Sequence, residues 1–324
     1  MMPVRIAGSA SVGPGRAIST AELVQRLPYA RDPADIEARS GIASRHFADA
    51  GDSYATLGAA VLRGALDAAA LAPEALTRIV FVSSLGGDLI FPATANMVAA
   101  GLGLAGTCDC FDLNNACMGF LTAFDLAARG IATGQGPVGI VVVELGSRYI
   151  TPDDPRPFLV FADAAAAVVL ARARGAGGML GSWLRNDGVA FGNVRLAHAG
   201  ITGQRETMRF TAPSARMAEE AVEAVCRATE GVLAQAGVML ADVRWILPHQ
   251  PNGAMLDAIT AALAVEPERV IRIVQEFGSV GAASIPVSLD RLLRTAPVQP
   301  GDYVLMVGVG AGISSGAVLL RLDA

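Results

Sequence analysis

Continuous apolar runs of strand length alternate with Ala-rich segments of helical length, and this alternation restricts the fold more than any other feature. Runs without polar alternation indicate strands that are covered on both faces by helices. The expected strands are residues 78–83, 139–144, 165–170, 243–247 and 303–307. The expected helices are residues 54–71, 118–132, 217–236 and 286–294. The pattern predicts an α/β protein.

The same order of segments occurs twice along the chain. A small-residue turn, a helical pattern at 119–130 and a buried strand at 139–146 are followed, about half a chain later, by a similar series over residues 281–310. Such an internal echo predicts two similar α/β halves packed together. We place them at residues 1–172 and 173–324.

The charge pattern removes several classes of protein. The 25 basic residues are all Arg, they are dispersed, and 30 acidic residues outnumber them. A chain without Lys offers neither a Schiff-base lysine nor the lysine of a phosphate-binding P-loop. The absence of a basic stripe argues against nucleic acid as a partner.

Cysteine content and hydropathy indicate the cellular compartment in which the protein is expected. Four cysteines in a chain that is 52% hydrophobic do not suggest a disulfide scaffold, and Cys108-x-Cys110 lacks the second pair of a zinc site, so no metal is expected. The first 14 residues do not resemble a secretion signal. The uncharged stretches 89–108 and 303–320 contain polar residues, Pro or Gly, which favours buried strands and tight turns over membrane helices. We therefore expect a cytoplasmic protein without a membrane partner.

Cys117 is the first candidate for chemistry. It lies in residues 112–120, DLNNACMGF, where a loop of small and polar residues passes into a helical pattern. Unpaired amides and the positive end of a helix would stabilise a thiolate there and make it a nucleophile. The alternative is an inert core cysteine, which is our interpretation of Cys108, Cys110 and Cys226.

His249 and a glycine-rich loop are the other candidates. His249 directly follows an apolar strand, which places an imidazole at the mouth of a sheet, whereas His46 and His198 have the sequence context of surface or loop residues. Residues 308–316, GVGAGISSG, lack the lysine and the spacing of a nucleotide loop. Their backbone amides could instead approach an acyl oxygen and form an oxyanion hole.

Together these segments resemble the β-ketoacyl-acyl carrier protein synthase III family of the thiolase superfamily, nearly from end to end. The similar motifs are residues 112–120 around the nucleophile, 161–170 (FADAAAAVVL, similar to FGDGAGAVVL), 248–252 (PHQPN, similar to PHQAN), 39–45 (RSGIASR) and 91–94 (FPAT). The resemblance implies a thiolase-like, five-layered αβαβα fold and a homodimer in which the segment at Phe91 closes the partner's acyl tunnel.

The resemblance also implies a ping-pong reaction without a cofactor. Cys117 would accept the acyl group from an acyl-CoA or acyl-carrier-protein thioester, and His249 would assist attack by a malonyl-derived enolate. The implied oxyanion hole consists of the amides of Cys117, Gly310, Ala311 and Gly312. The implied substrate contacts are Arg39, Phe91, Phe161, Phe210 and Asn252. For the floor of the tunnel we expect Phe91, Met97, Leu159 and Phe210, although each would equally suit a core.

Three departures from the family pattern concern the substrates. Ser279 stands where the motif GNTSAAS has its catalytic Asn, and Asp35 stands where the family has an adenine-stacking Trp. The segment after His249, where the family often has basic residues for a carrier protein, has no positive charge, and the helix near Met217 continues with Ala-Glu-Glu. A carrier protein is therefore a weaker expectation than in the family at large.

Three functions remain open after these departures. We favour acyl transfer from Cys117 to a second substrate, with His249 as general base and Ser279 in the site, within fatty-acid-like or specialised metabolism. The first alternative is the ordinary decarboxylating condensation of acyl-CoA with a malonyl carrier protein. The second alternative is a catalytically silent subunit of a heteromeric synthase.

Overall fold

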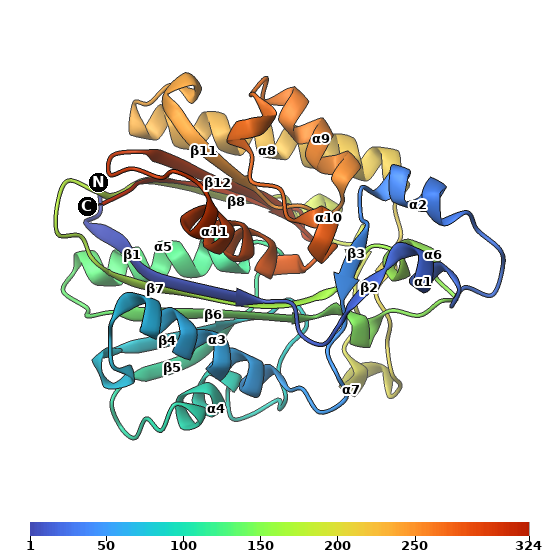
Figure 1. Cartoon of the computed structure of the whole chain (residues 1–324), viewed down its shortest axis with the longest axis horizontal. Coiled ribbons are helices and arrows are strands. Elements are labelled where there is room, and N and C mark those ends of the chain that lie inside the picture. The colour runs from blue at the N-terminus through green and yellow to red at the C-terminus, as the bar shows by residue number, and fades with distance from the viewer. Residues whose placement is uncertain (324) are drawn as a thin grey trace.

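The computed structural model describes residues 1–323 and contains two mixed β-sheets that stack face to face (Figure 1). The first sheet has the order β1-β7-β6-β4-β5, formed by Val4–Val12 (β1), Asp163–Arg172 (β7), Val138–Leu145 (β6), Arg78–Val82 (β4) and Asp109–Leu113 (β5). The second has the order β11-β12-β13-β8, formed by Val243–Pro248 (β11), Tyr303–Gly310 (β12), Ser314–Arg321 (β13) and Gly178–Asn186 (β8).

Strand directions repeat between the two sheets. In the first, β1 is antiparallel to β7, β7 is antiparallel to β6, and β6 is parallel to β4. In the second, β8 is antiparallel to β13, β13 is antiparallel to β12, and β12 is parallel to β11. The expectation of two similar halves is confirmed by this repeat. The boundary itself, between residues 172 and 173, stays a prediction; it falls in the connection from β7 to β8.

Helices complete five layers (Figure 1). The outer layers are Tyr54–Ala69 (α3) and Thr94–Gly101 (α4) on one side, and Ser214–Ala236 (α8) and Gly253–Ala262 (α9) on the other. Gly119–Ala132 (α5) and Ser284–Thr295 (α11) lie between the sheets. Their buried side chains join both sheets in one apolar cluster, which includes Phe120, Phe124, Ile285 and Leu289. The αβαβα arrangement expected from the resemblance is confirmed.

Smaller elements surround the opening of the site. They are Ala17–Ser19 (β2), Thr20–Val24 (α1), Pro33–Ser40 (α2), Ser44–His46 (β3), Pro155–Phe158 (α6), Val194–Arg195 (β9), Ala199–Thr202 (α7), Arg209–Phe210 (β10) and Val274–Phe277 (α10). Pro at the start of α2 and α6 and an αL glycine, Gly41, after α2 give these short helices defined ends. They gather at the end of the molecule opposite the chain termini (Figure 1).

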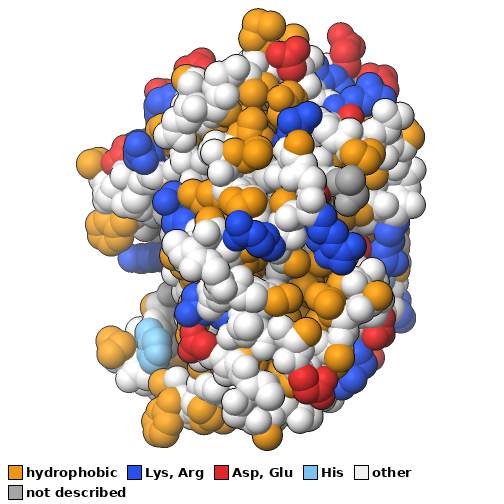
Figure 2. Space-filling view, turned by 90° about the vertical axis from the view of Figure 1, so that its left-hand side faces the viewer, with side chains coloured by type: hydrophobic (Ala, Val, Ile, Leu, Met, Phe, Trp, Pro, Cys, Tyr) orange, Lys and Arg blue, Asp and Glu red, His pale blue; other side chains and the backbone are white. Residues whose placement is uncertain are grey.

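Each predicted strand and helix is present, but β1, β5, β8 and β13 were not among the strands predicted, and the stretch 89–108 differs from the expectation. That stretch contains helix α4 rather than a buried strand, because Ala-rich residues pack one face of α4 against α3 and β5. No helix among residues 1–323 is long and apolar enough to cross a bilayer. On the face that holds the chain termini, Arg side chains are scattered among uncharged and acidic ones (Figure 2).

Candidate active site

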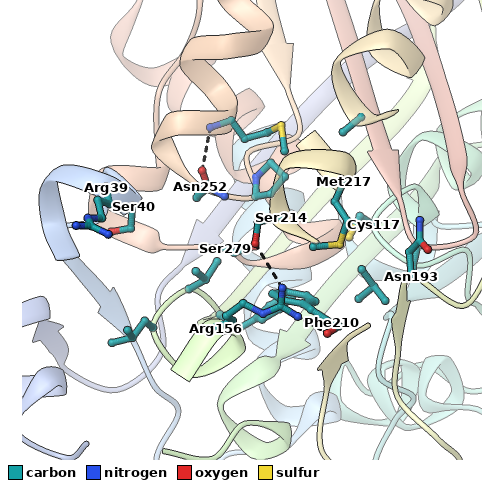
Figure 3. A pocket seen from close by; sticks show the side chains of 18 of the residues that line it. Arg39, Ser40, Cys117, Arg156, Asn193, Phe210, Ser214, Met217, Asn252 and Ser279 are labelled. Carbon is teal, nitrogen blue, oxygen red and sulfur yellow. Dashed lines mark hydrogen bonds between the residues drawn. The ribbon is translucent and has the colours of Figure 1, made fainter. Parts of the chain in front are cut away.

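A cavity of about 520 Å³ opens among these small elements, and both Cys117 and His249 line it. Figure 3 shows Cys117 and Ser279 among the side chains of this cavity. Residues from both halves of the chain line it. Those predicted from the sequence are Arg39, Cys117, Phe161, Phe210, His249, Asn252, Ser279, Gly310, Ala311 and Gly312. Phe91 does not line it, and this side chain is 83% exposed. Of the expected tunnel floor, Leu159 and Phe210 line the cavity, whereas Met97, on α4, is not among the residues that line it, and its place in the tunnel stays a prediction.

A strained turn positions Cys117 before α5. Ala116 adopts a φ of 45°, and its amide donates to Asn114 Oδ1 at 3.0 Å. The neighbouring Asn115 donates to Thr122 Oγ1 at 2.9 Å, which ties the turn to the first turns of α5. The chain can therefore present the sulfur to the cavity while Met118 remains buried in the core.

Glycines of β12 bring the two halves together behind the nucleophile. A Cβ atom placed on Gly310 would lie 3.1 Å from the Cys117 amide nitrogen, so any larger residue would press on this amide, and glycine best allows the close approach. A Cβ atom on Gly308 would lie 3.1 Å from His249 Cβ and 3.2 Å from Met118 Sδ. Strand β12 thus holds the Cys117 turn and the His249 segment against one another.

The electrostatic setting of Cys117 differs from the prediction. Burial, reinforced by the negative charge of Glu144, raises the pKa of the Cys117 thiol to about 12. The backbone amides of Cys117 and Ala311 act in the opposite direction, as an oxyanion hole would, but they do not outweigh burial. The expectation of a stabilised thiolate is therefore wrong, because reasoning from the helix end alone omits desolvation and Glu144.

His249 continues the line of β11 into the cavity. Its amide donates to Val307 O at 2.8 Å, which extends the parallel ladder by one residue. Burial lowers the pKa of His249 to about 4, so the imidazole is neutral at pH 7. Within residues 1–323 its buried Nδ1 has no hydrogen-bond partner. A neutral imidazole that lines the same cavity as a neutral thiol can accept a proton during a reaction.

Gln250 fixes the segment that carries His249, and sequence reasoning missed it. This fully buried amide donates to Ile271 O at 2.7 Å and to Ser288 Oγ at 3.2 Å. Its Oε1 accepts from the amides of Ile273 and Val274 at 2.9 and 3.0 Å. Its position directly after His249 was the available signal. Asn252, expected to contact substrate, lines the cavity and also caps α9 by accepting from Met255 N at 2.8 Å.

Ser279 is held in place by its backbone. Its amide donates to Val160 O at 2.9 Å, and its carbonyl accepts from Ala162 N at 2.9 Å. This bridge connects the turn before α11 to the segment that leads into β7. A serine hydroxyl here extends less far into the cavity than the carboxamide of an Asn, and it offers one rotatable O–H.

Arginine and aromatic side chains form the rim. Arg39 pairs with Asp35 one turn earlier on α2, Nε to Oδ1 2.8 Å, and both side chains are exposed. The guanidinium of Arg31 stacks 4.9 Å from the ring centre of Tyr29, and both residues line the cavity. Tyr29 and Arg31 were not predicted, because neither lies in a recognisable motif.

The rim helix α2 touches the His249 segment directly. A Cβ atom on Gly41, which ends α2, would lie 2.6 Å from the Cα atom of Gly253, which begins α9. Backbone therefore meets backbone at this point, and larger residues would force the two helices apart.

A second wall is aromatic. The rings of Phe161 and Phe210 lie 5.8 Å apart, and the Arg156 guanidinium lies 5.4 Å from the Phe210 ring. Arg156 also donates to Ala212 O at 3.2 Å and to Ser214 Oγ at 3.4 Å (Figure 3). The wall suits an apolar acyl chain. Among residues 1–323 no group of three or more His, Cys, Asp or Glu side chains is placed to hold a metal ion.

The sequence of this chain is similar to those of one family of known proteins. The family described as 3-oxoacyl-[acyl-carrier-protein (ACP)] synthase III matches residues 111–188, and its C-terminal counterpart matches residues 233–322. A β-ketoacyl-[acyl-carrier-protein] synthase III from Bordetella petrii is 35% identical over 329 residues, covering 98% of this chain and 97% of the relative.

Two solved structures extend the likeness to the fold. The 3-oxoacyl-(acyl carrier protein) synthase III of Pseudomonas aeruginosa has a TM-score of 0.90 at 30% identity, covering 99% of each chain. The priming β-ketosynthase of a polyketide biosynthetic pathway has a TM-score of 0.90 at 28% identity, covering 99% of this chain and 96% of that one.

Proposed function

Because this chain belongs to the 3-oxoacyl-[acyl-carrier-protein] synthase III family of acyltransferases, we propose that it loads an acyl group from a thioester onto Cys117 and passes it to a second nucleophile beside His249. The reaction serves fatty-acid or polyketide-like biosynthesis, in keeping with its relatives. The observation that carries the second half of the proposal is Ser279 in the position of the family's catalytic Asn.

The first step forms the acyl-enzyme. His249 takes the proton of the Cys117 thiol, and the sulfur attacks the thioester carbonyl while the amides of Cys117 and Ala311 stabilise the developing oxyanion. A new carbon–sulfur bond forms at Cys117, the bond to the donor sulfur breaks, and the donor leaves as a thiol with the proton from His249. No metal or further cofactor takes part in this step.

The second step discharges the acyl group. Neutral His249 accepts a proton from an amine, a hydroxyl or an acidic carbon, and the resulting nucleophile attacks the acyl-cysteine. The bond to Cys117 breaks, and its sulfur recovers the proton. Condensation with malonyl thioester needs a second donor on the enolate oxygen, and losing one such donor typically costs on the order of 10²–10³ in rate. Ser279 supports the nucleophile-acceptor reaction over this condensation.

The donor is an acyl thioester of coenzyme A or of a carrier protein. Tyr29 and Arg31 at the rim support a coenzyme A donor, because they offer the stacking surface that Asp35 does not. The absence of any cation on α9 gives a carrier protein little to dock on there.

A second copy of the chain is the expected partner. Ile90 is 87% exposed and Phe91 83% exposed in the loop before α4, and this apolar segment supports the homodimer in which it reaches the neighbouring tunnel.

Intact-protein mass spectrometry tests both steps. Wild type incubated with acetyl-, octanoyl- and palmitoyl-CoA should gain one acyl mass, and Cys117→Ala should gain none. Malonyl-CoA is then added and CO₂ is measured, with Ser279→Asn as the matched variant. We expect little CO₂ from wild type and at least tenfold more from Ser279→Asn.

The remaining outcomes separate the alternatives. Substantial CO₂ release from wild type, equal to that from Ser279→Asn, would establish the decarboxylating synthase and overturn acyl transfer without condensation. A wild-type protein that gains no acyl mass from these coenzyme A thioesters, nor from the same acyl groups on a carrier protein, would instead be a silent subunit.

A further inference from the structure

Glu144 is a buried carboxylate that neither proposed step uses. It lies near the end of β6, its side chain is 2% exposed, and no guanidinium pairs with it among residues 1–323. A buried charge without a counter-ion is costly, so its retention at this place calls for a function.

Hydrogen bonds connect Glu144 to both turns of the active site. Its Oε1 accepts from the amide and hydroxyl of Ser84 at 2.9 and 2.6 Å. Ser84 O accepts from Asn114 Nδ2 at 3.5 Å, and Asn114 Oδ1 accepts from the amide of Ala116, the strained residue before Cys117. This chain of contacts runs from Glu144 to the nucleophile.

A second arm runs to the Ser279 turn. The same Oε1 accepts from the amide of Ala282 at 3.1 Å, three residues after Ser279. Gly281 between them has a φ of 49°, and a Cβ atom there would lie 3.1 Å from Glu144 Cδ. The turn is thus wrapped closely around the carboxylate.

We propose that Glu144 is a positioning residue that joins the turns of Cys117 and Ser279 and whose charge governs the reactivity of the Cys117 thiol. This inference rests on the proposed role of Cys117 as nucleophile. The negative charge of the carboxylate acts on two titratable groups, Cys117 before α5 and Tyr54 on α3. A negative charge close to a buried thiol opposes formation of the thiolate, so loss of the charge should ease it.

Two substitutions separate the two parts of the proposal. Glu144→Gln keeps an oxygen for Ser84 and Ala282, and its amide can donate to Ser83 Oγ, which lies 3.5 Å from Oε2. It removes only the charge. Glu144→Asp keeps the charge but is one methylene shorter and cannot hold both arms. Glu74→Gln, on an exposed 3₁₀ turn, is the matched control.

The readout is the rate of carboxamidomethylation of Cys117 by iodoacetamide from pH 6 to 10, followed on the Cys117 peptide by mass spectrometry. In Glu144→Gln the profile should move to lower pH, with alkylation about tenfold faster at pH 8, a shift of about one unit. Glu144→Asp should keep the wild-type pH profile while its acylation by acetyl-CoA falls at least tenfold.

Each contrary result is decisive. A Glu144→Gln profile equal to that of wild type and of Glu74→Gln would overturn control by charge, and wild-type acylation in Glu144→Asp would overturn positioning. Absence of alkylation at wild-type Cys117 at every pH would instead count against the proposed function, and with it this inference.

Discussion

Asp125 and Asp290 hold equivalent places in the two halves of the chain, and each is hydrogen-bonded across to the other half. Asp125 on α5 accepts from Ser182 on β8 at 2.5 Å, and Asp290 on α11 accepts from Ser9 on β1 at 2.8 Å. Each aspartate also pairs with an Arg four residues later. The two contacts are reciprocal, as a duplicated unit would make them.

We expect Asp290→Ala to lower the free energy of unfolding by about 2–3 kcal/mol, because it leaves the buried hydroxyl of Ser9 without its acceptor. Arg294→Ala removes the exposed partner of the same carboxylate and should cost about 0.5 kcal/mol or less. Urea denaturation measures both. Equal effects of the two substitutions would contradict the importance of the contact between halves.

The stability of Glu144→Gln should depend on pH relative to wild type. Burial raises the pKa of Glu144 from 4.5 to about 7, so the folded state holds this proton more tightly than the unfolded state. The contribution of the protonated Glu144 carboxyl to the stability of the folded state is complete below pH 4.5, and it is lost as pH rises to about 7. Between pH 4.5 and pH 8 the free energy of unfolding of Glu144→Gln should therefore rise by on the order of 3 kcal/mol relative to that of wild type. A constant difference across that range would show that the carboxyl titrates normally.

His249 should make the free energy of unfolding depend on pH in the opposite direction. Burial lowers the pKa of His249 from 6.5 to about 4, so the unfolded state binds the proton first and wild type loses stability as pH falls through this window. His249→Asn cannot take up that proton. Between pH 7 and 4.5 wild type should lose about 2–3 kcal/mol more than the variant. Parallel unfolding curves for the two proteins would mean that His249 is exposed to water in solution.

Gly310→Ala should impair acylation more than folding. The added methyl would lie 3.1 Å from the Cys117 amide nitrogen, so this amide must shift by a few tenths of an ångström relative to the oxyanion. We expect acylation by acetyl-CoA to fall between about tenfold and a hundredfold. Gly192→Ala, where a Cβ atom meets nothing within 4 Å, is the control. Wild-type rates in Gly310→Ala would place the oxyanion away from this amide.

Much of the fold is encoded in local pattern. The buried strands β4, β6 and β12 are continuous apolar runs, and α5 and α11 stand directly before such strands in both halves. Strand β1 escaped prediction because Gly8, Ser9 and Ser11 interrupt its apolar pattern. Ser9 and Ser11 can lie in β1 because both donate hydrogen bonds to Asp290 on α11, which lies near the other end of the sequence.

The active site likewise contains residues that the sequence reveals and residues that only the folded structure reveals. Cys117 and His249 could be found because short motifs surround them, and the cavity brings them together. Glu144 could not be found, because Ala282, its contact in the second half, is 138 residues away. The thiol pKa was predicted in the wrong direction for the same reason: burial and charge are properties of the assembled site.

The backbone contact between Gly41 and Gly253 has a consequence for redesign of this protein. Helix α2, which bears Arg39, and helix α9, which follows His249, are in contact without side chains to absorb a change. Loop insertions or grafts that lengthen the rim would therefore also displace the imidazole. New donor specificity is better sought by replacing individual rim side chains, such as Tyr29 or Asp35, on an unaltered backbone.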